Sequence, residues 1–336
     1  MSGARSKLLP VWLGLSGLLF TATGLGFVHF VVGPMLHAST QRDLRSAAAQ
    51  LAEKLDTRMA ERWQDITLAA RRQVLRERAG ESPEREVVDE IKARHPRYAW
   101  VGFTDENCLV RVSTERSLDG ADVEERPWCR EARRGAFVGD VHEAKLLQSR
   151  IKDLGQIGLL MDIAVPVRSP TNTVVGVLAA HVMADWLIDV NNSMQGASPV
   201  ETLILTSKGQ VIVGPQALMG SMLDEPTFTR AKKSGAQQGP WPDGTYLSTA
   251  AATSGVESFP GLGWIAVARV SPEQASASER HILLWVLITG VALSLVMALL
   301  GSLLARGHET VPPEPIRAPE PSRPLRPKVP SRADAQ

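Results

Sequence analysis

The sequence predicts an α+β protein with a long N-terminal helix, two tandem modules built on antiparallel sheets, and two flanking membrane-spanning helices. Three observations predict this arrangement. One long apolar segment lies near each end of the chain. A stretch with helical periodicity follows the first of these segments. Short alternating strands separated by turns then occupy most of the remaining chain, in two successive groups.

The two apolar segments have the length and composition of transmembrane helices. Residues 8–36 contain no Asp, Glu, Lys or Arg, and residues 282–305 are uncharged as well. A helix needs roughly 20 apolar residues to cross the hydrocarbon core, because each residue adds only about 1.5 Å. We therefore predict transmembrane helices over residues 8–33 and 282–305.

Each segment also has a simpler interpretation. A cleaved signal peptide is the alternative for the first segment. Its apolar run is longer than the roughly 7–15 residues usual in such peptides, and residues 36–38 offer only a weak cleavage site. A buried core helix is the alternative for the second segment. Uniform apolarity up to an abrupt stop at Arg306 argues against it.

Basic residues near the two spans indicate their orientation. Arg5 and Lys7 precede the first span, Arg306 follows the second, and five more Lys or Arg occur further on. Lys and Arg near the helix ends favour the cytoplasmic side. Both termini, 1–7 and 306–336, are therefore expected in the cytoplasm, and the long central region on the other side of the membrane.

The C-terminal segment has the composition of a chain that cannot build a core. Residues 306–336 include eight Pro and very few large apolar side chains. We predict a disordered, partly extended tail. A flexible terminus and a docking segment for a proline-binding groove both fit this composition.

Several functional classes lack support in the sequence. A net charge of +1 gives no basic field for nucleic acid, and two Cys are too few for a Cys-rich zinc site. No Gly-rich loop with GK[ST], no G-x-S-x-G and no H-E-x-x-H is present. We therefore predict neither an enzyme nor a cofactor.

A long helix is expected directly after the first apolar segment. Apolar residues recur with three-and-four spacing from Leu44 to Val74. Thr40 and Asp43 resemble an N-terminal capping box, and residues 79–83 should end the helix. The helix could carry a displacement or act as a static spacer, and the periodicity fits both.

Two groups of strands then define two modules, at about 84–184 and 198–275, within a region spanning residues 37–280. A short helix over about 185–195 separates them. Alternation and turn residues place the strands. The expected strands are 99–103, 109–113, 163–167 and 174–182 in the first module, and 202–206, 211–214, 246–253 and 263–270 in the second.

Four stretches, taken in order, resemble the double Cache domain, a PAS-like extracytoplasmic sensor of bacterial chemoreceptors, sensor kinases and diguanylate cyclases. They are FTDENCLVRVST, RPWCREARRGAFVGDV, DIAVPVRSPTNTVVGVLAAHV and FPGLGWIAVARVSPEQA. The segment VGDVHEAKLL is most similar to sensor modules of diguanylate cyclases, although no output domain follows the second span. The resemblance implies two tandem PAS-like modules, the first of them distal to the membrane.

The resemblance also implies a ligand pocket in the distal module. In Cache domains that bind amino acids, an Arg and a Trp hold the ligand carboxylate, and a later Asp holds its ammonium group. Arg126 and Trp128 match the first pair, but His181 stands where that Asp is expected. The loss of this negative charge favours an anion such as an organic acid, with an amino acid as the alternative.

Six residues are therefore the candidates for ligand binding: Arg126, Trp128, Asp140, His142, Asp162 and His181. The two Asp side chains are expected to orient the imidazoles or partly neutralise the site. Each candidate also has a structural interpretation, core packing for the Trp and satisfied structural histidines for the two His. No metal is predicted, because these His and Asp lack a compact His-x-x-x-His spacing.

The expected function is that of a two-pass sensor in a bacterial inner membrane, with its sensor domain in the periplasm. It would bind a small molecule and signal to a separate kinase, cyclase or chemotaxis protein, as a homodimer by analogy. A non-signalling binding protein and a truncated receptor are the alternatives. Cys108 and Cys129 would lie in an oxidising compartment, where a disulfide and two separate thiols are both compatible with the sequence.

The topology leads to a direct test. A reporter inserted near Ser198 should be active or labelled only on the periplasmic side, because two spans enclose the region that contains it. Reporter fusions after residue 306 serve as the cytoplasmic control. Labelling of the Ser198 position from the cytosol alone would contradict the topology.

Overall fold

The computed structural model describes residues 3–144, 155–196 and 199–308, and they form two compact units. One unit is Phe30–His281, which contains two sheets and the helices that cover them. The other unit combines the N-terminal segment up to His29 with the segment from Ile282 onward. Most contacts of each unit lie within that unit.

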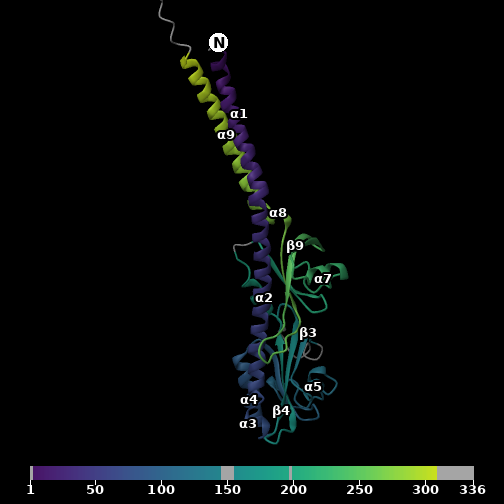
Figure 1. Ribbon diagram of the computed structural model, residues 1–336. Coiled ribbons are helices and arrows are strands. Elements are labelled where there is room, and N and C mark those ends of the chain that lie inside the picture. Colours follow the sequence, from purple (N-terminus) through teal and green to yellow (C-terminus); the bar gives the residue numbers. More distant parts are fainter. Residues whose placement is uncertain (1–2, 145–154, 197–198, 309–336) are drawn as a thin grey trace, which may run out of the picture. The chain divides into compact units, whose positions relative to one another are not determined.

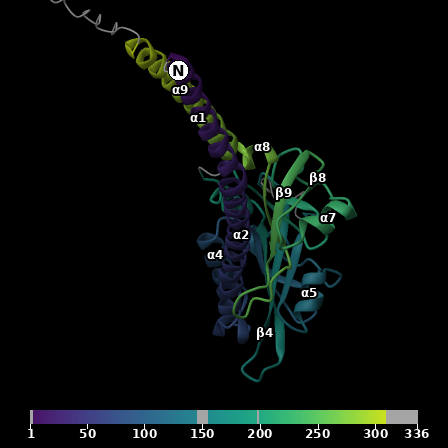
Figure 2. The ribbon, with the colours of Figure 1, turned by 45° about the horizontal axis from the view of Figure 1, so that its top comes forward.

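Two antiparallel helical segments make up the second of these units (Figures 1 and 2). They belong to α1 (Gly3–Phe27) and α9 (Ala277–His308), and both helices are long and apolar enough to cross a membrane. Small residues allow close approach: a Cβ atom on Gly17 would lie 2.6 Å from the Ser294 hydroxyl. A Cβ on Gly290 would likewise lie 2.3 Å from the hydroxyl of Thr21. Such small-residue contacts are typical of helix pairs in membranes.

The helical chain does not stop between α1 and the long helix α2. A π-helical turn, Val28–Val32, leads directly into α2, Gly33–Ala69. The capping box expected at Thr40 is wrong, because Thr40 lies inside α2 and its hydroxyl donates to the carbonyl of Leu36 at 3.1 Å. The predicted end near residues 79–83 is also wrong. Two further helices follow instead, α3 (Gln73–Arg76) and α4 (Glu81–Arg94).

Two five-stranded antiparallel sheets follow, each with one strand order. The first sheet runs β2-β1-β5-β4-β3, and the second runs β7-β6-β10-β9-β8. We call the parts built on them the N-terminal and C-terminal modules. The N-terminal strands are β1 (Tyr98–Thr104), β2 (Val110–Ser113), β3 (Phe137–Glu143), β4 (Leu159–Arg168) and β5 (Val174–Met183). The C-terminal strands are β6 (Glu201–Leu205), β7 (Val211–Val213), β8 (Gln237–Trp241), β9 (Gly244–Ala252) and β10 (Ile265–Val270).

The predicted α+β fold with two tandem antiparallel modules is confirmed. The second sheet repeats the strand order of the first, with each strand replaced by the one five places later. Strands β3 and β8 are the two that the sequence patterns missed. Short helices complete the modules: η2 (Thr114–Arg116), α5 (Pro127–Ala132), α6 (Trp186–Asn192), α7 (Glu225–Ala231) and α8 (Pro272–Ala275).

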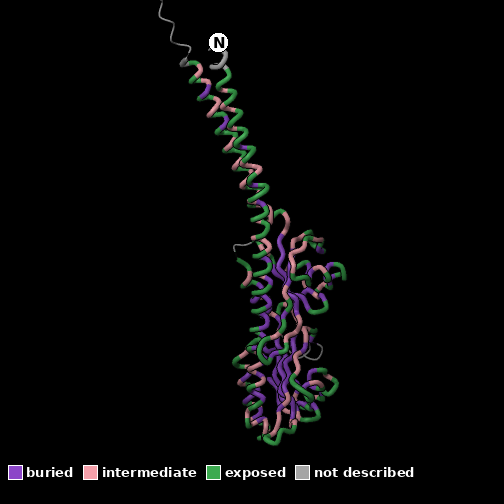
Figure 3. The backbone as a smooth tube through the Cα atoms, in the orientation of Figure 1, coloured by how far each residue is buried: buried purple, intermediate pink, exposed green. Residues whose placement is uncertain are grey.

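Helix α2 packs along one face of both sheets, and α5 and α7 lie on the opposite face (Figure 1). Its predicted apolar stripe is buried, from Leu44 to Ile66, as the tube in Figure 3 shows. Leu44 packs with Ala268 and Val270 of β10, whereas the stripe from Leu51 onward packs in the core that includes the N-terminal sheet. One helix face therefore serves two cores.

Arg269 is the largest charged side chain in the C-terminal core. It is 0% exposed, and its guanidinium donates to both carboxylate oxygens of Asp243, at 2.8 and 2.5 Å. It also pairs with Glu201 and lies 3.8 Å above the ring of Tyr246. Burial raises the pKa of Asp243, but the hydrogen bonds and charge of Arg269 outweigh that effect and lower the pKa overall.

This ion pair should make the protein sensitive to acid. A lowered pKa for Asp243 stabilises the fold above the ordinary pKa of Asp, and this contribution is lost as pH falls through the folded value. Asp243→Asn should cost about 3 kcal/mol at pH 7, because Arg269 loses its bidentate partner. Urea unfolding at pH 7 and at pH 4 would measure both effects. Asp224→Asn, at an exposed position whose side chain makes no capping bond, is the matched control and should change neither value.

Candidate ligand-binding site

The N-terminal module contains a cavity of about 340 Å³ between α5 and the face of the sheet that carries β3, β4 and β5. The structure brings all six predicted residues to its wall. The remaining lining residues are mainly apolar: Leu118, Val123, Pro127, Phe137, Gly139, Glu143, Ala144 and Leu160.

Alternation along the strands decides which side chains reach the cavity. On β4, the odd-numbered Met161 and Ile163 join the core shared with α2. Asp162, between them, points to the other face, where α5 lies. Asp162 pairs directly with His181 of the neighbouring strand β5. The two side chains are therefore cross-strand neighbours on the cavity face, 19 residues apart in sequence.

A β-bulge brings the second histidine to the same face. Strand β3 pairs with β4 at Gly139 and Asp162, and the register then shifts so that His142 pairs with Leu160. Without the extra residue, Val141 would occupy the position of His142. Gly139 also matters here, because a Cβ atom at this position would lie 3.2 Å from Cβ of Asp162.

One carboxylate oxygen joins the two imidazoles. Asp162 Oδ1 lies 2.9 Å from His142 Nε2 and 2.5 Å from His181 Nδ1. Asp162 and His181 are buried, whereas the His142 side chain is 42% exposed. The hydrogen bond to Asp162 raises the pKa of His142 despite partial burial. Burial would raise the pKa of Asp162, but the charge and hydrogen bonds of the two histidines hold it well below its usual range.

Indole rings enclose the buried imidazole of His181. Its ring centroid lies 5.0 Å from that of Trp100 and 5.7 Å from that of Trp128, the second in an edge-on arrangement. The two tryptophans also contact each other at 5.8 Å. Trp128 was among the predicted residues, and Trp100 was not. Trp100 is fully buried behind His181 and does not line the cavity, so its position in the strand predicted over 99–103 fits core packing.

Helix α5 carries Arg126 and Trp128 to the cavity. Arg126 is the residue just before α5, in extended conformation, and Pro127 starts the helix with its fixed φ. The guanidinium of Arg126 is partly exposed and has no hydrogen bond or ion pair with any residue that the structure describes. Within the described part of the chain, a cation without a partner thus lies at a cavity with aromatic residues in its wall.

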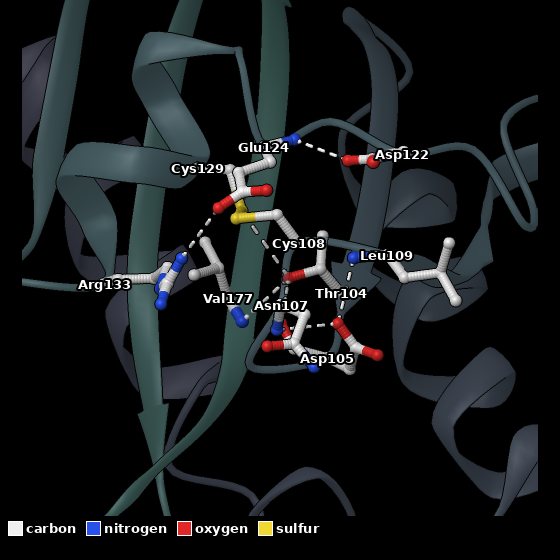
Figure 4. The surroundings of a disulfide bond; sticks show 10 residues. All are labelled: Thr104, Asp105, Asn107, Cys108, Leu109, Asp122, Glu124, Cys129, Arg133 and Val177. Carbon is white, nitrogen blue, oxygen red and sulfur yellow. Dashed lines mark hydrogen bonds and ion pairs between the residues drawn. A yellow bond between two sulfur atoms is a disulfide. The ribbon is translucent and has the colours of Figure 1, made fainter.

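A disulfide fixes α5 to the sheet. Cys129 of α5 is bonded to Cys108, in the turn between β1 and β2, with their Cα atoms 6.1 Å apart. Figure 4 shows that this bond lies beside Thr104, whose hydroxyl accepts a hydrogen bond from the backbone N–H of Val177 at 3.2 Å. Of the two states that the sequence allowed, the structure has the disulfide. It joins the segment that carries Arg126 to the turn between β1 and β2.

Asp140 has a different role from the other predicted residues. Its Oδ1 accepts hydrogen bonds from the indole N–H of Trp264, at 2.7 Å, and from the backbone N–H of Val141, at 2.8 Å. Trp264 directly precedes β10 of the C-terminal module and is 1% exposed. Asp140 therefore lines the cavity and, at the same time, links the two modules.

Comparison with known proteins identifies the fold. No family model matches the sequence, and no curated protein matches it. Among solved structures, the ligand-binding domain of the Pseudomonas aeruginosa PAO1 amino acid chemoreceptor PctB, in complex with L-Arg, is 16% identical with a TM-score of 0.57. That match covers 71% of this chain and 98% of the other.

Two further structures agree with this match. The extracellular domain of the putative histidine kinase rpHK1S-Z16 is 14% identical, with a TM-score of 0.55 and coverage of 72% of this chain and 97% of that one. An extracellular ligand binding receptor from Desulfohalobium retbaense DSM5692 is 12% identical, with a TM-score of 0.52. There the match covers 68% of this chain but only 40% of the receptor chain.

The fold of this chain is thus that of double Cache ligand-binding domains, with a long N-terminal helix and two five-stranded sheets. At these identities, the likeness establishes the shared architecture. The closer likeness to sensor modules of diguanylate cyclases stays a prediction.

The disulfide should stabilise the N-terminal module substantially. Cys108→Ser combined with Cys129→Ser removes a bond that closes a loop over a sequence separation of 21, so the free energy of unfolding should fall by about 3 kcal/mol. Urea unfolding with and without reductant would measure the difference. Reductant should destabilise the natural chain and leave the double variant unaffected. Equal unfolding midpoints for the natural chain and the double variant, both measured without reductant, would contradict this role.

Proposed function

We propose that this chain is a two-pass sensor of a bacterial inner membrane that binds a small molecule in the cavity of its N-terminal module. Spans over residues 8–33 and 282–305 would anchor it, and residues 37–280 would form the periplasmic domain. Two apolar helices of sufficient length support this topology, as does a disulfide, which persists in oxidising compartments. The fold supports it too, because it is shared with extracellular ligand-binding domains.

The guanidinium of Arg126, which lies at the cavity and has no partner among the described residues, is the observation that carries the assignment. A planar guanidinium binds a carboxylate with two parallel hydrogen bonds, and such charge-assisted bonds are strong where water is excluded. Trp128 and Phe137 supply the apolar wall for the remainder of a ligand. A cavity of about 340 Å³ fits a small organic acid or an amino acid.

Both carboxylates among the six predicted residues are already engaged, which favours an organic acid over an amino acid; Glu143, the other acidic residue of the wall, is exposed. An ammonium group needs a carboxylate that is free to receive it. Asp162 already contacts two imidazoles, and Oδ1 of Asp140 accepts two hydrogen bonds. PctB, in complex with L-Arg, is an amino acid chemoreceptor with the same fold. The ligand proposed for this chain differs in its charge.

Signalling would run through the link between the modules. Ligand binding that moves β3 would act on Asp140, and through it on Trp264, the residue before β10. Strand β10 leads through α8 into α9. We propose that the output is a separate kinase, cyclase or chemotaxis protein, that the sensor works as a homodimer through α2, and that the chain itself is not an enzyme.

Calorimetry with the full chain in detergent micelles tests the ligand assignment. A panel of organic acids and amino acids is titrated into the protein, and at least one small carboxylate should bind with 1:1 stoichiometry. Arg126→Ala should weaken that binding by about 10- to 100-fold, the range expected for a lost charged hydrogen bond. Arg130→Ala is the matched control, because Arg130 lies in α5, four residues after Arg126, and pairs with Glu131. Binding of a cationic amine with no response to any anion would refute the assignment.

A further inference from the structure

We propose that His142, Asp162 and His181 form a binding site for a divalent transition-metal ion of the Zn²⁺ class. The three residues each offer one donor atom, and all three atoms lie within 4.8 Å of one another. Imidazole nitrogen and carboxylate oxygen are donors that Zn²⁺ and its neighbours in the first transition row accept. This site lies in the cavity already described but takes no donor atom from Arg126.

The backbone holds these donors together. His142, Asp162 and His181 come from β3, β4 and β5, which are adjacent strands of one sheet. The ladder places Asp162 opposite His181, and the bulge in β3 turns His142 to the same face. Three ligands on three paired strands form a preorganised set, so little ordering would be needed to bind an ion.

The tautomer of His142 supports a cation at this point. Its Nδ1 lies 2.9 Å from the carbonyl oxygen of Glu143, which can only accept a hydrogen bond, so Nδ1 carries a proton. In a neutral imidazole the other nitrogen, Nε2, then directs a lone pair at Asp162 Oδ1, 2.9 Å away. A ring N–H bound to a carbonyl is also the usual outer support of a metal-ligating histidine.

The residues around the three donors would leave at least one coordination position of a bound ion open to the cavity. Trp100 and Trp128 cover His181, so this side of the cluster is dry. His142 is 42% exposed and lies at the cavity, so the remaining coordination positions would face the space into which a ligand enters. One consequence rests on the proposed function: a bound ion would offset the charge of Asp162 and, with Arg126, favour an anionic ligand.

Metal titration of the full chain tests the site. The protein is purified without a histidine tag, stripped with a chelator, and titrated with Zn²⁺ alone by calorimetry. Binding should be 1:1, and His142→Ala and Asp162→Asn should each weaken it at least about tenfold, because changes outside the ligand set already cost roughly 10- to 100-fold. Cu²⁺ should quench indole fluorescence with the same stoichiometry, since two tryptophans lie beside His181.

Two control variants show whether a loss of Zn²⁺ binding is specific to the three proposed ligands. His95→Ala removes a histidine that pairs with Asp65 at 3.0 Å outside the cavity, and it should leave Zn²⁺ affinity unchanged. Arg126→Ala should also retain the metal, which separates this site from carboxylate binding. Circular dichroism checks that each variant is folded, and the partly exposed His142 gives the variant with least effect on packing.

The outcomes separate the two proposals. Absence of Zn²⁺ binding, or binding that persists unchanged in both His142→Ala and Asp162→Asn, would overturn the metal site and leave carboxylate binding untouched. Zn²⁺ binding without any carboxylate binding would support the metal site and overturn the proposed ligand class.

Discussion

The apolar stripe of α2 is the constraint on which the unit Phe30–His281 depends. Each five-stranded sheet has two apolar faces, and neither face can remain in water. Short helices such as α5 and α7 lie on one face of each sheet, and α2 packs on the other face of both, joined by α4 at β1 and β2. Because the two cores share this one helix, the modules cannot reorient without disturbing residues such as Leu44 at one end and Ile66 at the other.

The cavity follows from the same layering. Where α5 packs on the N-terminal sheet, Trp128 and Cys129 are buried, but the helix is only six residues long and cannot cover the whole face. The uncovered part, over β3 and β4, is the cavity, and polar side chains on these strands become its floor. The disulfide then holds α5 in place over a sheet face that it only partly fills.

Periodicity made most of this architecture predictable. The three-and-four spacing that begins at Leu44 identified α2, and alternation identified eight of the ten strands, because burial of one face imposes both patterns. Helix ends were less predictable. Thr40 can cap a helix, but here the apolar segment before it is helical too, so no terminus exists for it to cap. Pro83 looked like a helix stop and instead lies in the first turn of α4, where proline is tolerated.

The site shows the limit of inference from sequence. A resemblance nominated six residues, and the structure places them around one cavity. No pattern in the chain could show that Asp162 and His181 are cross-strand partners, because register depends on the whole sheet. The bulge that turns His142 inward has no sequence signature either. Nor does spacing reveal that Asp140 reaches a tryptophan 124 residues further on.

That last contact has a thermodynamic consequence. Asp140 belongs to the wall of the cavity, and its carboxylate also receives the indole N–H of Trp264 from the other module. If an occupant of the cavity strengthens or weakens this bond, linkage requires the bond to alter the occupant's affinity by the same factor. The affinity of the cavity for an occupant is then a property of both modules together. A change in the position of β10 that alters this bond would change the concentration at which the cavity fills.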